Sequence, residues 1–486
     1  MTHVEVELKL ELDPADVAAL LRSSRTRASE DESHHLVATY FDTPDRAVWQ
    51  SGYSLRIRRD GRRRIQTVKA SGEPAAGLFA RGEWERAVCG DTPVLDAASD
   101  PLLQAIGQEA AARIAPVFVT DVKRRTSRFV FEGADLELSV DCGVVHAAER
   151  AAPIVELELE LRAGDMRALF DFARQLDGHV PLRLAVHSKP ERGYALLGGT
   201  APGPAKAEPV PLTPATPAAD ALCTILRSCI RHYRLNESLL LRSDDSEAVH
   251  QARVALRRLR TALWVFRPLL RGDADVRLLD LELRRLASVL GEARNLDVLI
   301  ARFGLRSSPV LVTARSRAYE HIRSELESAR PRILMLDLLE WLSTGRWLNA
   351  PKDTDQMREP VLAFAARRLE RGRHRLKRLT PALAERGRRR SHRVRIEAKK
   401  ARYVAGFFTS LWASRRARVR LDKWLGKLEC VQDRLGELND LAVARRILKA
   451  HHLESTLSRA GHAASLRSEA REALETLIDA PGFWTQ

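Results

Sequence analysis

Residues 3–12 alternate strictly between polar, mostly charged, and apolar side chains. In the segment HVEVELKLEL, Glu5, Glu7 and Lys9 share one parity, and aliphatic residues fill the even positions from 4 to 10. Successive side chains of a β-strand point to opposite faces, so this segment predicts a strand with one apolar face and one face carrying both signs of charge. A one-sided sheet with its polar face in water explains one such strand. The meaning of the charged face therefore depends on the strands that follow.

Several later segments of the first 200 residues repeat this pattern. In PIVELELELR (153–162), Glu156, Glu158 and Glu160 alternate with leucines. Further charged positions of shared parity are Arg56 and Arg58; Arg81, Glu83 and Glu85; Lys123 and Arg125; and Glu137 and Asp141, with Lys69 and Lys189 as isolated cations. If the apolar faces pack on helices outside, the charged faces converge on a water-filled lumen. We therefore predict an α+β domain in which an antiparallel β-barrel, closed so that no edge is exposed, is flanked by helices.

A lumen with both signs of charge suits a particular chemistry. Arg and Lys match the oxygens of a triphosphate chain, but neighbouring carboxylates would repel that chain unless divalent cations stood between. Mg²⁺ or Mn²⁺ takes carboxylate, water and phosphate oxygens and polarises the phosphoryl group. The pattern thus indicates metal-assisted cleavage of a phosphoanhydride. The alternative is a surface of interstrand ion pairs, each worth about 0–1 kcal/mol.

A proline- and glycine-rich stretch divides the chain into two parts of opposite charge. Residues 198–219 read GGTAPGPAKAEPVPLTPATPAA, which predicts a semi-extended linker. Residues 1–200 hold 26 Lys and Arg against 31 Asp and Glu, so the net charge of +16 resides in residues 201–486, which carry +21. We expect a first domain over 1–200, a linker over 201–217 and a helical domain over 218–480. The basic domain calls for a polyanionic partner.

The helical part repeats itself. HQARVALRRLR (250–260) matches HRVRIEAKKAR (392–402), and LGEARNLDVL (290–299) aligns with LGELNDLAVA (435–444). The two offsets, 142 and 145, are nearly equal. This predicts an all-α domain built from two related helical-bundle halves.

Each half carries a histidine followed by cations at helical spacing. These residues fall within roughly a quarter of a helix circumference, while Leu256, Leu259 and Leu263 face the opposite way, toward a core. A solvated basic face is the simplest interpretation, but its repetition favours one basic groove shared by both halves. Either histidine fits a structural role as well as contact with a ligand. The residues concerned are His250, Arg253, Arg257 and Arg260 in the first half, and His392, Arg395, Lys399 and Arg402 in the second.

The remaining composition narrows the partner and the compartment. No nucleic-acid-binding motif is present and few aromatic residues lie on the basic faces, so a polyanion without bases is the better partner. The five cysteines are scattered without metal-ligand or disulfide spacing. No uncharged apolar run reaches about 18 residues, and the chain begins directly with a strand. We expect a cytoplasmic protein without a membrane span, and association with polyphosphate granules stays open.

Seven segments in order give the first 200 residues a family resemblance. They are Glu5-x-Glu7-x-Lys9, YFDTPD, GYSLRIRR, RGEWE, SVDCG, PIVELELELRAGD and SKPERGYALL. Together they resemble the CYTH family, which contains class IV adenylyl cyclases, thiamine triphosphatases and inorganic triphosphatases and folds as a triphosphate tunnel. The resemblance implies that triphosphate is bound by Lys9, Arg56, Arg58, Lys69, Arg81, Arg125 and Lys189, and metal by Glu5, Glu7, Asp141, Glu156 and Glu158. It further implies that Glu83, Glu85 and Glu160 orient the basic residues.

Two points follow for individual residues. Within Lys123-Arg124-Arg125, strand parity with Ser127 favours Arg125 as the residue that points inward. The catalytic set implied by the resemblance consists of Glu5, Glu7, Lys9, Glu156 and Glu158.

The helical repeat resembles the CHAD family over residues 218–480. The resemblance lies in both H-x-x-R-x-x-x-[R/K]-[R/K] segments and in Arg294-Asn295 and Asn439-Asp440. That family is associated with binding of inorganic polyphosphate, which implies a polyphosphate site in this groove. The domain order resembles that of bacterial CYTH–CHAD inorganic triphosphatases.

The expected function is hydrolysis of inorganic triphosphate with Mg²⁺ or Mn²⁺, beside a helical domain that binds polyphosphate. Thiamine triphosphatase and class IV adenylyl cyclase activity are the enzymatic alternatives, although no site for adenine and ribose is recognisable. A non-catalytic polyphosphate-binding protein is the third. The oligomeric state does not follow from these patterns.

Overall fold

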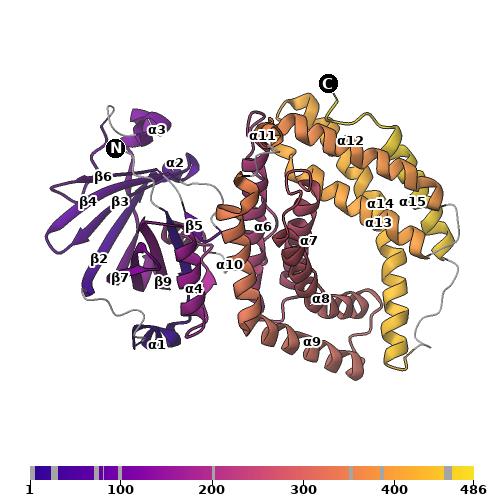
Figure 1. Cartoon of the computed structure of the whole chain (residues 1–486), viewed down its shortest axis with the longest axis horizontal. Coiled ribbons are helices and arrows are strands. Elements are labelled where there is room, and N and C mark those ends of the chain that lie inside the picture. The colour runs from indigo at the N-terminus through magenta and orange to yellow at the C-terminus, as the bar shows by residue number, and fades with distance from the viewer. Residues whose placement is uncertain are drawn as a thin grey trace. The chain divides into compact units, whose positions relative to one another are not determined.

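The computed structural model describes residues 6–22, 31–70, 76–79, 82–96, 101–199, 203–349, 354–383, 388–453 and 462–485. The chain forms two compact units. The first takes in Met1–Gly203 and Glu327–Thr344, and the second takes in Pro204–Leu326 and Gly345–Gln486. The first contains a sheet with helices and the second is helical (Figure 1). The predicted α+β fold class is confirmed, whereas the predicted domain limits stay predictions.

Ten strands of the first unit form one antiparallel sheet. Their order is β10-β1-β9-β8-β7-β2-β3-β4-β6, and β5 pairs with β1 from outside this path. The strands are β1 (Glu7–Glu11), β2 (Asp31–Asp42), β3 (Tyr53–Asp60), β4 (Arg63–Ala70), β5 (Leu78–Phe79), β6 (Glu83–Ala87), β7 (Ala115–Phe131), β8 (Ala134–Ala147), β9 (Arg150–Ala163) and β10 (Arg183–Leu184).

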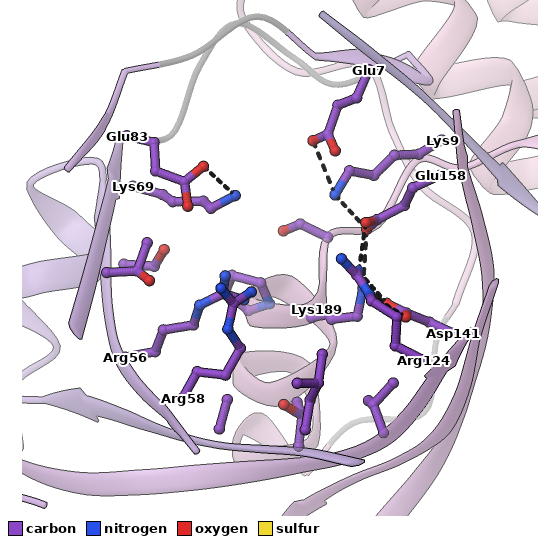
Figure 2. A pocket seen from close by; sticks show the side chains of 18 of the residues that line it. Glu7, Lys9, Arg56, Arg58, Lys69, Glu83, Arg124, Asp141, Glu158 and Lys189 are labelled. Atoms are coloured by element: carbon purple, nitrogen blue, oxygen red, sulfur yellow. Dashed lines mark hydrogen bonds and ion pairs between the residues drawn. The ribbon is translucent and has the colours of Figure 1, made fainter. Parts of the chain in front are cut away.

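The sheet curves around a lumen (Figure 2), but strand pairing does not close it. In the part of the chain that the structure describes, β6 pairs only with β4. Along the sequence, β6 begins at Glu83 shortly after the end of β5, and β5 pairs with β1. The described strands therefore form an open, curved sheet and not the predicted closed barrel.

Helices of the first unit cover the apolar outer face and one part of the inner face. The outer leucines of β1 and β9, including Leu8 and Leu157, are fully buried, and α4 packs against β9 with Leu169 and Phe170 buried. The helix α5 packs instead on β7, β8 and β9, where Tyr194 joins an aromatic cluster with Tyr40. The helices are α1 (Val17–Arg22), α2 (Ala47–Gln50), α3 (Pro101–Ala111), α4 (Arg167–Asp177) and α5 (Lys189–Gly198).

The position of α5 is fixed by its own sequence. Ser188 caps the helix and Glu191 returns a hydrogen bond to the Ser188 backbone, which forms a capping box. At Gly193 a Cβ atom would lie 2.4 Å from the Phe118 ring, so only glycine permits this close approach. The Tyr194 hydroxyl donates a hydrogen bond to the buried Asp42 carboxylate. These contacts hold Lys189, the first residue of α5, at the lumen.

One helix from the second half of the sequence belongs to the first unit. The helix α10 (Ala329–Thr344) packs on α4. Arg332 forms a buried bidentate pair with Asp177, with Nε 2.6 Å from Oδ1 and Nη2 3.1 Å from Oδ2. Arg174 of α4 pairs with Asp337 and Glu340 of α10. The first unit therefore includes a segment that lies beyond the linker in sequence.

The second unit contains two helical groups in which corresponding helices meet. The helices α7 and α13 carry the repeated histidine segments and contact one another, as do α8 and α14. Leu256, Leu259 and Leu263 are buried, as predicted. The helices are α6 (Ala218–Leu240), α7 (Ser246–Val265), α8 (Asp275–Arg302), α9 (Pro309–Glu327), α11 (Thr354–Arg358), α12 (Val361–Leu379), α13 (Arg388–Phe407), α14 (Arg415–Ala450) and α15 (His462–Asp479).

Candidate functional site

The lumen of the first unit is a cavity of about 600 Å³ lined mainly by charged side chains. Figure 2 shows these side chains pointing from the surrounding strands toward its centre. Of the predicted residues, those that line it are Glu7, Lys9, Arg56, Arg58, Lys69, Glu83, Glu85, Glu137, Asp141, Glu158, Glu160 and Lys189. These residues come from six strands and one helix and meet in one place.

Strand register brings acids and bases of this cavity into contact. In the antiparallel pair of β1 and β9, Lys9 lies opposite Glu158. The Lys9 Nζ atom is 2.8 Å from Glu158 Oε1 and 3.1 Å from Glu7 Oε1. Residues directly opposite one another lie on the same face of the sheet. The charged side chains of one strand therefore lie beside those of the next.

Three buried carboxylates gather on one wall, and Lys189 lies among them. Its Nζ atom is 2.8 Å from Asp141 Oδ2, 2.8 Å from Glu156 Oε2 and 3.1 Å from Glu158 Oε1. Arg124 donates to the same group, with Nη2 2.6 Å from Glu158 Oε2 and Nε 2.7 Å from Asp141 Oδ1. The acidic cluster is therefore neutralised by cations of the chain itself.

This pairing sets the ionisation of the cluster. Burial alone would raise the pKa of Glu158, but Arg124, Lys189 and Lys9 outweigh it and hold that pKa well below its ordinary value. The pKa of Asp141 is lowered in the same way by Lys189 and Arg124 against its burial. Burial would lower the pKa of Lys189, whereas the three carboxylates raise it well above its usual range. Asp141, Glu158 and Lys189 are thus charged at neutral pH.

The carboxylate cluster fits a divalent cation. Asp141, Glu156 and Glu158 each offer an oxygen, and these oxygens lie within 4.8 Å of one another. Glu156 Oε1 is buried, and Arg192 Nε lies 3.3 Å from it without the geometry of a hydrogen bond. Such a set of oxygen ligands suits a hard cation. Lys189 contacts all three carboxylates, so a cation binding there competes with its ammonium group.

The opposite wall of the cavity is predominantly basic. Lys69 pairs with Glu83 at 2.7 Å and Arg58 approaches Glu85 at 3.5 Å. Arg56 Nε is buried and has no hydrogen-bond acceptor. The pKa of Lys69 is lowered by burial and by the nearby Arg56 guanidinium. This wall holds more positive charge than its carboxylates neutralise, so it can accept an anion.

The prediction that Arg125 points into the lumen is wrong. Arg124 lies opposite Asp141 and lines the cavity. Arg125 lies opposite Val140, on the apolar outer face of the sheet. The reason is that Ser127, used to assign the parity, lies opposite the buried Leu138 and not in the lumen.

Other predicted residues have different outcomes. Glu5 and Arg81 lie outside the described residues. Glu156 belongs to the carboxylate cluster but is buried behind the cavity lining. Two cations that the sequence analysis did not select are also present: Arg192 pairs with Glu11 and Glu156, and Arg162 pairs with Glu137 and Glu160. Strand parity could have identified Arg162, which continues the charged face of β9.

A larger pocket, of about 1430 Å³, lies in the second unit. The two helical repeats contribute to it together. The predicted residues that line it are His250, Arg253, Arg257, Arg260, Arg395, Lys399 and Arg402, whereas His392 is exposed and is not part of the lining. Arg294 and Asn295 from α8, and Asn439 and Asp440 from α14, line it as well. We call this the central basic pocket.

Charges in the central basic pocket repel one another. Burial together with Arg257 and Arg395 lowers the pKa of Lys399 to about 7. Burial and Arg294 lower the pKa of His250 to about 4, so this histidine is neutral at physiological pH. Twelve Lys and Arg residues line the pocket, against four aspartates. The excess positive charge has no counterion within the lining and favours an anionic ligand.

Comparison with known proteins gives both units a family. Residues 3–194 match the model of the CYTH domain, and residues 224–449 match that of the CHAD domain. The chain is a CYTH domain followed by a CHAD domain. Its CYTH region is 29% identical over 198 residues to an inorganic triphosphatase of Haemophilus influenzae, an alignment that covers 40% of this chain. The alignment covers 54% of the triphosphatase, so the chain matches about half of that relative's length.

Two further relatives cover more of the chain. An uncharacterised protein of Mycobacterium tuberculosis is 26% identical over 487 residues, covering 92% of this chain and 88% of its own. The crystal structure of the CHAD domain from the plant Ricinus communis has 25% identity and a TM-score of 0.46, and covers 56% of this chain and 91% of that domain. Among the described residues, helices long and apolar enough to cross a bilayer are absent.

Proposed function

We propose that the CYTH domain of this chain hydrolyses inorganic triphosphate with Mg²⁺ or Mn²⁺, and that its CHAD domain binds polyphosphate. One observation carries the first part: three buried carboxylates, with oxygens within 4.8 Å of one another, face a basic wall across one cavity. The similarity of the CYTH region to an inorganic triphosphatase supports it. The central basic pocket supports the second part.

The residues divide into two groups in this proposal. Asp141, Glu156 and Glu158 would hold the metal, joined by Glu7 and, from the sequence, Glu5. A bound metal would neutralise phosphate charge and polarise the phosphorus–oxygen bonds. Arg56, Arg58 and Lys69 bind the phosphate oxygens from the basic wall. Lys9 lies between the groups and contacts phosphate when it releases Glu158.

The reaction needs only water as a second reactant. Its oxygen bonds to the terminal phosphorus, the bridging P–O bond breaks, and orthophosphate and diphosphate leave. The protons of the water pass to the products and solvent. The fixed positive charges of the basic wall stabilise the negative charge that develops on the leaving diphosphate.

A substrate panel tests this function. The full-length protein is incubated with tripolyphosphate, ATP or thiamine triphosphate, each with Mg²⁺, Mn²⁺ or EDTA, and the products are separated. We expect orthophosphate and diphosphate from tripolyphosphate with metal and none with EDTA. If the protein forms cyclic AMP from ATP, or cleaves thiamine triphosphate in preference to tripolyphosphate, the proposed activity is wrong and the observed one takes its place. Absence of turnover with all three would leave a binding protein. The full chain is used because α10 is part of the first unit.

A further inference from the structure

The helix α12 carries a row of arginines without acidic partners. Arg368, Arg371, Arg375 and Arg378 recur at spacings of three and four residues, so they lie on one face of the helix. In the described part of the chain, none of the four takes part in an ion pair. We call these four residues the α12 arginine row.

Two other arginines of the same helix differ in this respect. Arg367 pairs with Glu359, and Arg373 pairs with Glu370 at 2.7 Å. Glu359 and Glu370 thus pair with Arg367 and Arg373, whereas the four arginines of the row have no ion pair within the described residues.

The α12 arginine row begins at the edge of the central basic pocket. On α7, Trp264 continues the stripe of Arg257 and Arg260 by one turn, and both Trp264 and Lys400 line the pocket. The Arg375 guanidinium lies 4.6 Å from the centre of the Trp264 ring, and Lys400 Nζ lies 4.4 Å from it. Arg368 lies 5.8 Å from the same ring. Trp264 therefore joins the two sets of cations.

The charge of Arg368 is repelled by its neighbours in the row. Burial, followed by Arg371 and Arg375, lowers the pKa of Arg368 to about 10. Arg368 and Arg375 are partly buried and both lie over the Trp264 ring, whereas Arg371 and Arg378 are exposed. From Arg368 to Arg378 the row spans about 15 Å at the rise of an α-helix. An extended chain of negative charges matches this length better than a compact anion.

The aromatic residues nearby favour a polyanion without bases. Cations already pack on the Trp264 ring, and Phe364 of α12 stacks on Phe266 with ring centres 4.7 Å apart. Proteins that hold single-stranded nucleic acid need exposed rings on which bases stack. The rings at this junction are occupied by other contacts.

We propose that the α12 arginine row is a second anion-binding segment, continuous with the central basic pocket at Trp264, which holds the part of a polyphosphate chain that extends beyond the pocket. This inference rests on the proposed binding of polyphosphate and adds a preference for long chains. The row contributes affinity only when the chain is long enough to reach it.

The test compares three full-length variants by isothermal calorimetry in EDTA, so that no turnover occurs. The first combines Arg368→Ala, Arg371→Ala and Arg375→Ala, and alanine preserves the helix. The second combines Arg415→Ala, Arg416→Ala and Arg418→Ala, which removes the same charge from exposed positions outside the pocket lining. The third combines Arg257→Met and Lys399→Met inside the pocket. The ligands are tripolyphosphate, long-chain polyphosphate and single-stranded DNA.

The row variant should bind long-chain polyphosphate roughly tenfold more weakly than the unmodified protein, and tripolyphosphate equally well. The control variant should bind both as before. The inference is overturned if the row variant keeps its affinity for long chains, if the control variant loses as much, or if DNA binds as tightly and with the same dependence on the row. Failure of the pocket variant to weaken any polyphosphate would instead contradict the proposed function of the CHAD domain.

Discussion

Two buried lysines show how the two pockets differ. Lys189 lies among three carboxylates, which raise its pKa well above the ordinary value despite burial. Lys399 lies beside Arg257 and Arg395, and burial together with these cations lowers its pKa to about 7. The first pocket is therefore neutralised from within, whereas the second holds positive charge that lacks a counterion. A lysine thus has carboxylate partners to exchange in the CYTH cavity, whereas in the central basic pocket a lysine is available to bind an anion.

This difference has a consequence for each ligand. In the CYTH cavity, a metal bound as proposed would displace Lys189 from its carboxylates, and a bound triphosphate would draw Lys9 and Arg124 away from theirs. Each exchange assists the other. In the central basic pocket some cations, such as Arg260, pair with a carboxylate. Lysines and arginines nevertheless outnumber the aspartates of the lining, so an anion meets positive charge that is not neutralised.

The largest effect is expected from Glu158→Gln in the CYTH cavity. Glu158 contacts Lys9, Arg124 and Lys189 and belongs to the metal cluster. Its loss should lower kcat for tripolyphosphate about a hundredfold or more. Phosphate release measures this, with the exposed Glu109→Gln as control. Retention of full activity in a folded Glu158→Gln protein would remove the carboxylate wall from the mechanism.

Next in size is the coupling between metal and anion in the CYTH cavity. Binding of Mn²⁺, followed by electron paramagnetic resonance, should tighten about tenfold when a non-hydrolysable imido analogue of triphosphate is present. Lys189→Met should tighten Mn²⁺ binding in the absence of the analogue, because the competing ammonium group is gone, and should reduce the coupling. Lys69→Met, which removes a lysine paired with Glu83 instead, is the control. Unchanged Mn²⁺ affinity in Lys189→Met would show that this exchange does not occur.

The pH dependence of the CHAD domain should reveal Lys399. Its pKa is about 7 in the fold against 10.5 for an ordinary lysine, so between these values the unfolded chain binds the extra proton and stability rises with pH. A bound polyanion raises this pKa again, and polyphosphate binding near pH 8 should take up protons. Calorimetry in buffers of different ionisation enthalpy measures the uptake. Lys399→Met should abolish it, and equal uptake in that variant would assign it to another group.

The smallest effect separates two neighbouring arginines. Arg124→Ala should lower triphosphate hydrolysis, because its guanidinium contacts Asp141 and Glu158 in the cavity. Arg125→Ala should leave kcat within about twofold and cost about 1 kcal/mol of stability, as for an ordinary substitution. Hydrolysis rates and thermal unfolding of both variants provide the comparison. If Arg125→Ala lost activity and Arg124→Ala kept it, Arg125 would be the residue that points into the lumen, as inferred from Ser127.

The error at Arg125 shows what strand alternation alone leaves open. Alternation places charges on one face of each strand. To decide whether Arg124 or Arg125 points into the lumen, however, the register between neighbouring strands is needed. That register was available in the sequence: Glu132 and Gly133 form a two-residue turn, both with positive φ, between β7 and β8. A turn at these residues pairs Phe131 with Ala134 and hence Arg124 with Asp141.

Features that depend on distant contacts were harder to predict. The helical repeat predicted seven residues of the central basic pocket because both copies carry the same spacing. The α12 arginine row has no such copy, and its meaning depends on Trp264 from another helix. The docking of α10 on α4 rests on Arg332 and Asp177, which are 155 residues apart, and an amphipathic helix does not specify its partner.

The division of labour between the pockets is tested most directly by two variants assayed for two activities. Glu158→Gln and the Arg257→Met, Lys399→Met protein are compared for phosphate release from tripolyphosphate with Mg²⁺ and for binding of long-chain polyphosphate. We predict that the first loses hydrolysis and keeps polyphosphate binding, and that the second does the opposite. Loss of both activities in either folded variant, or loss of neither in both, would contradict the account.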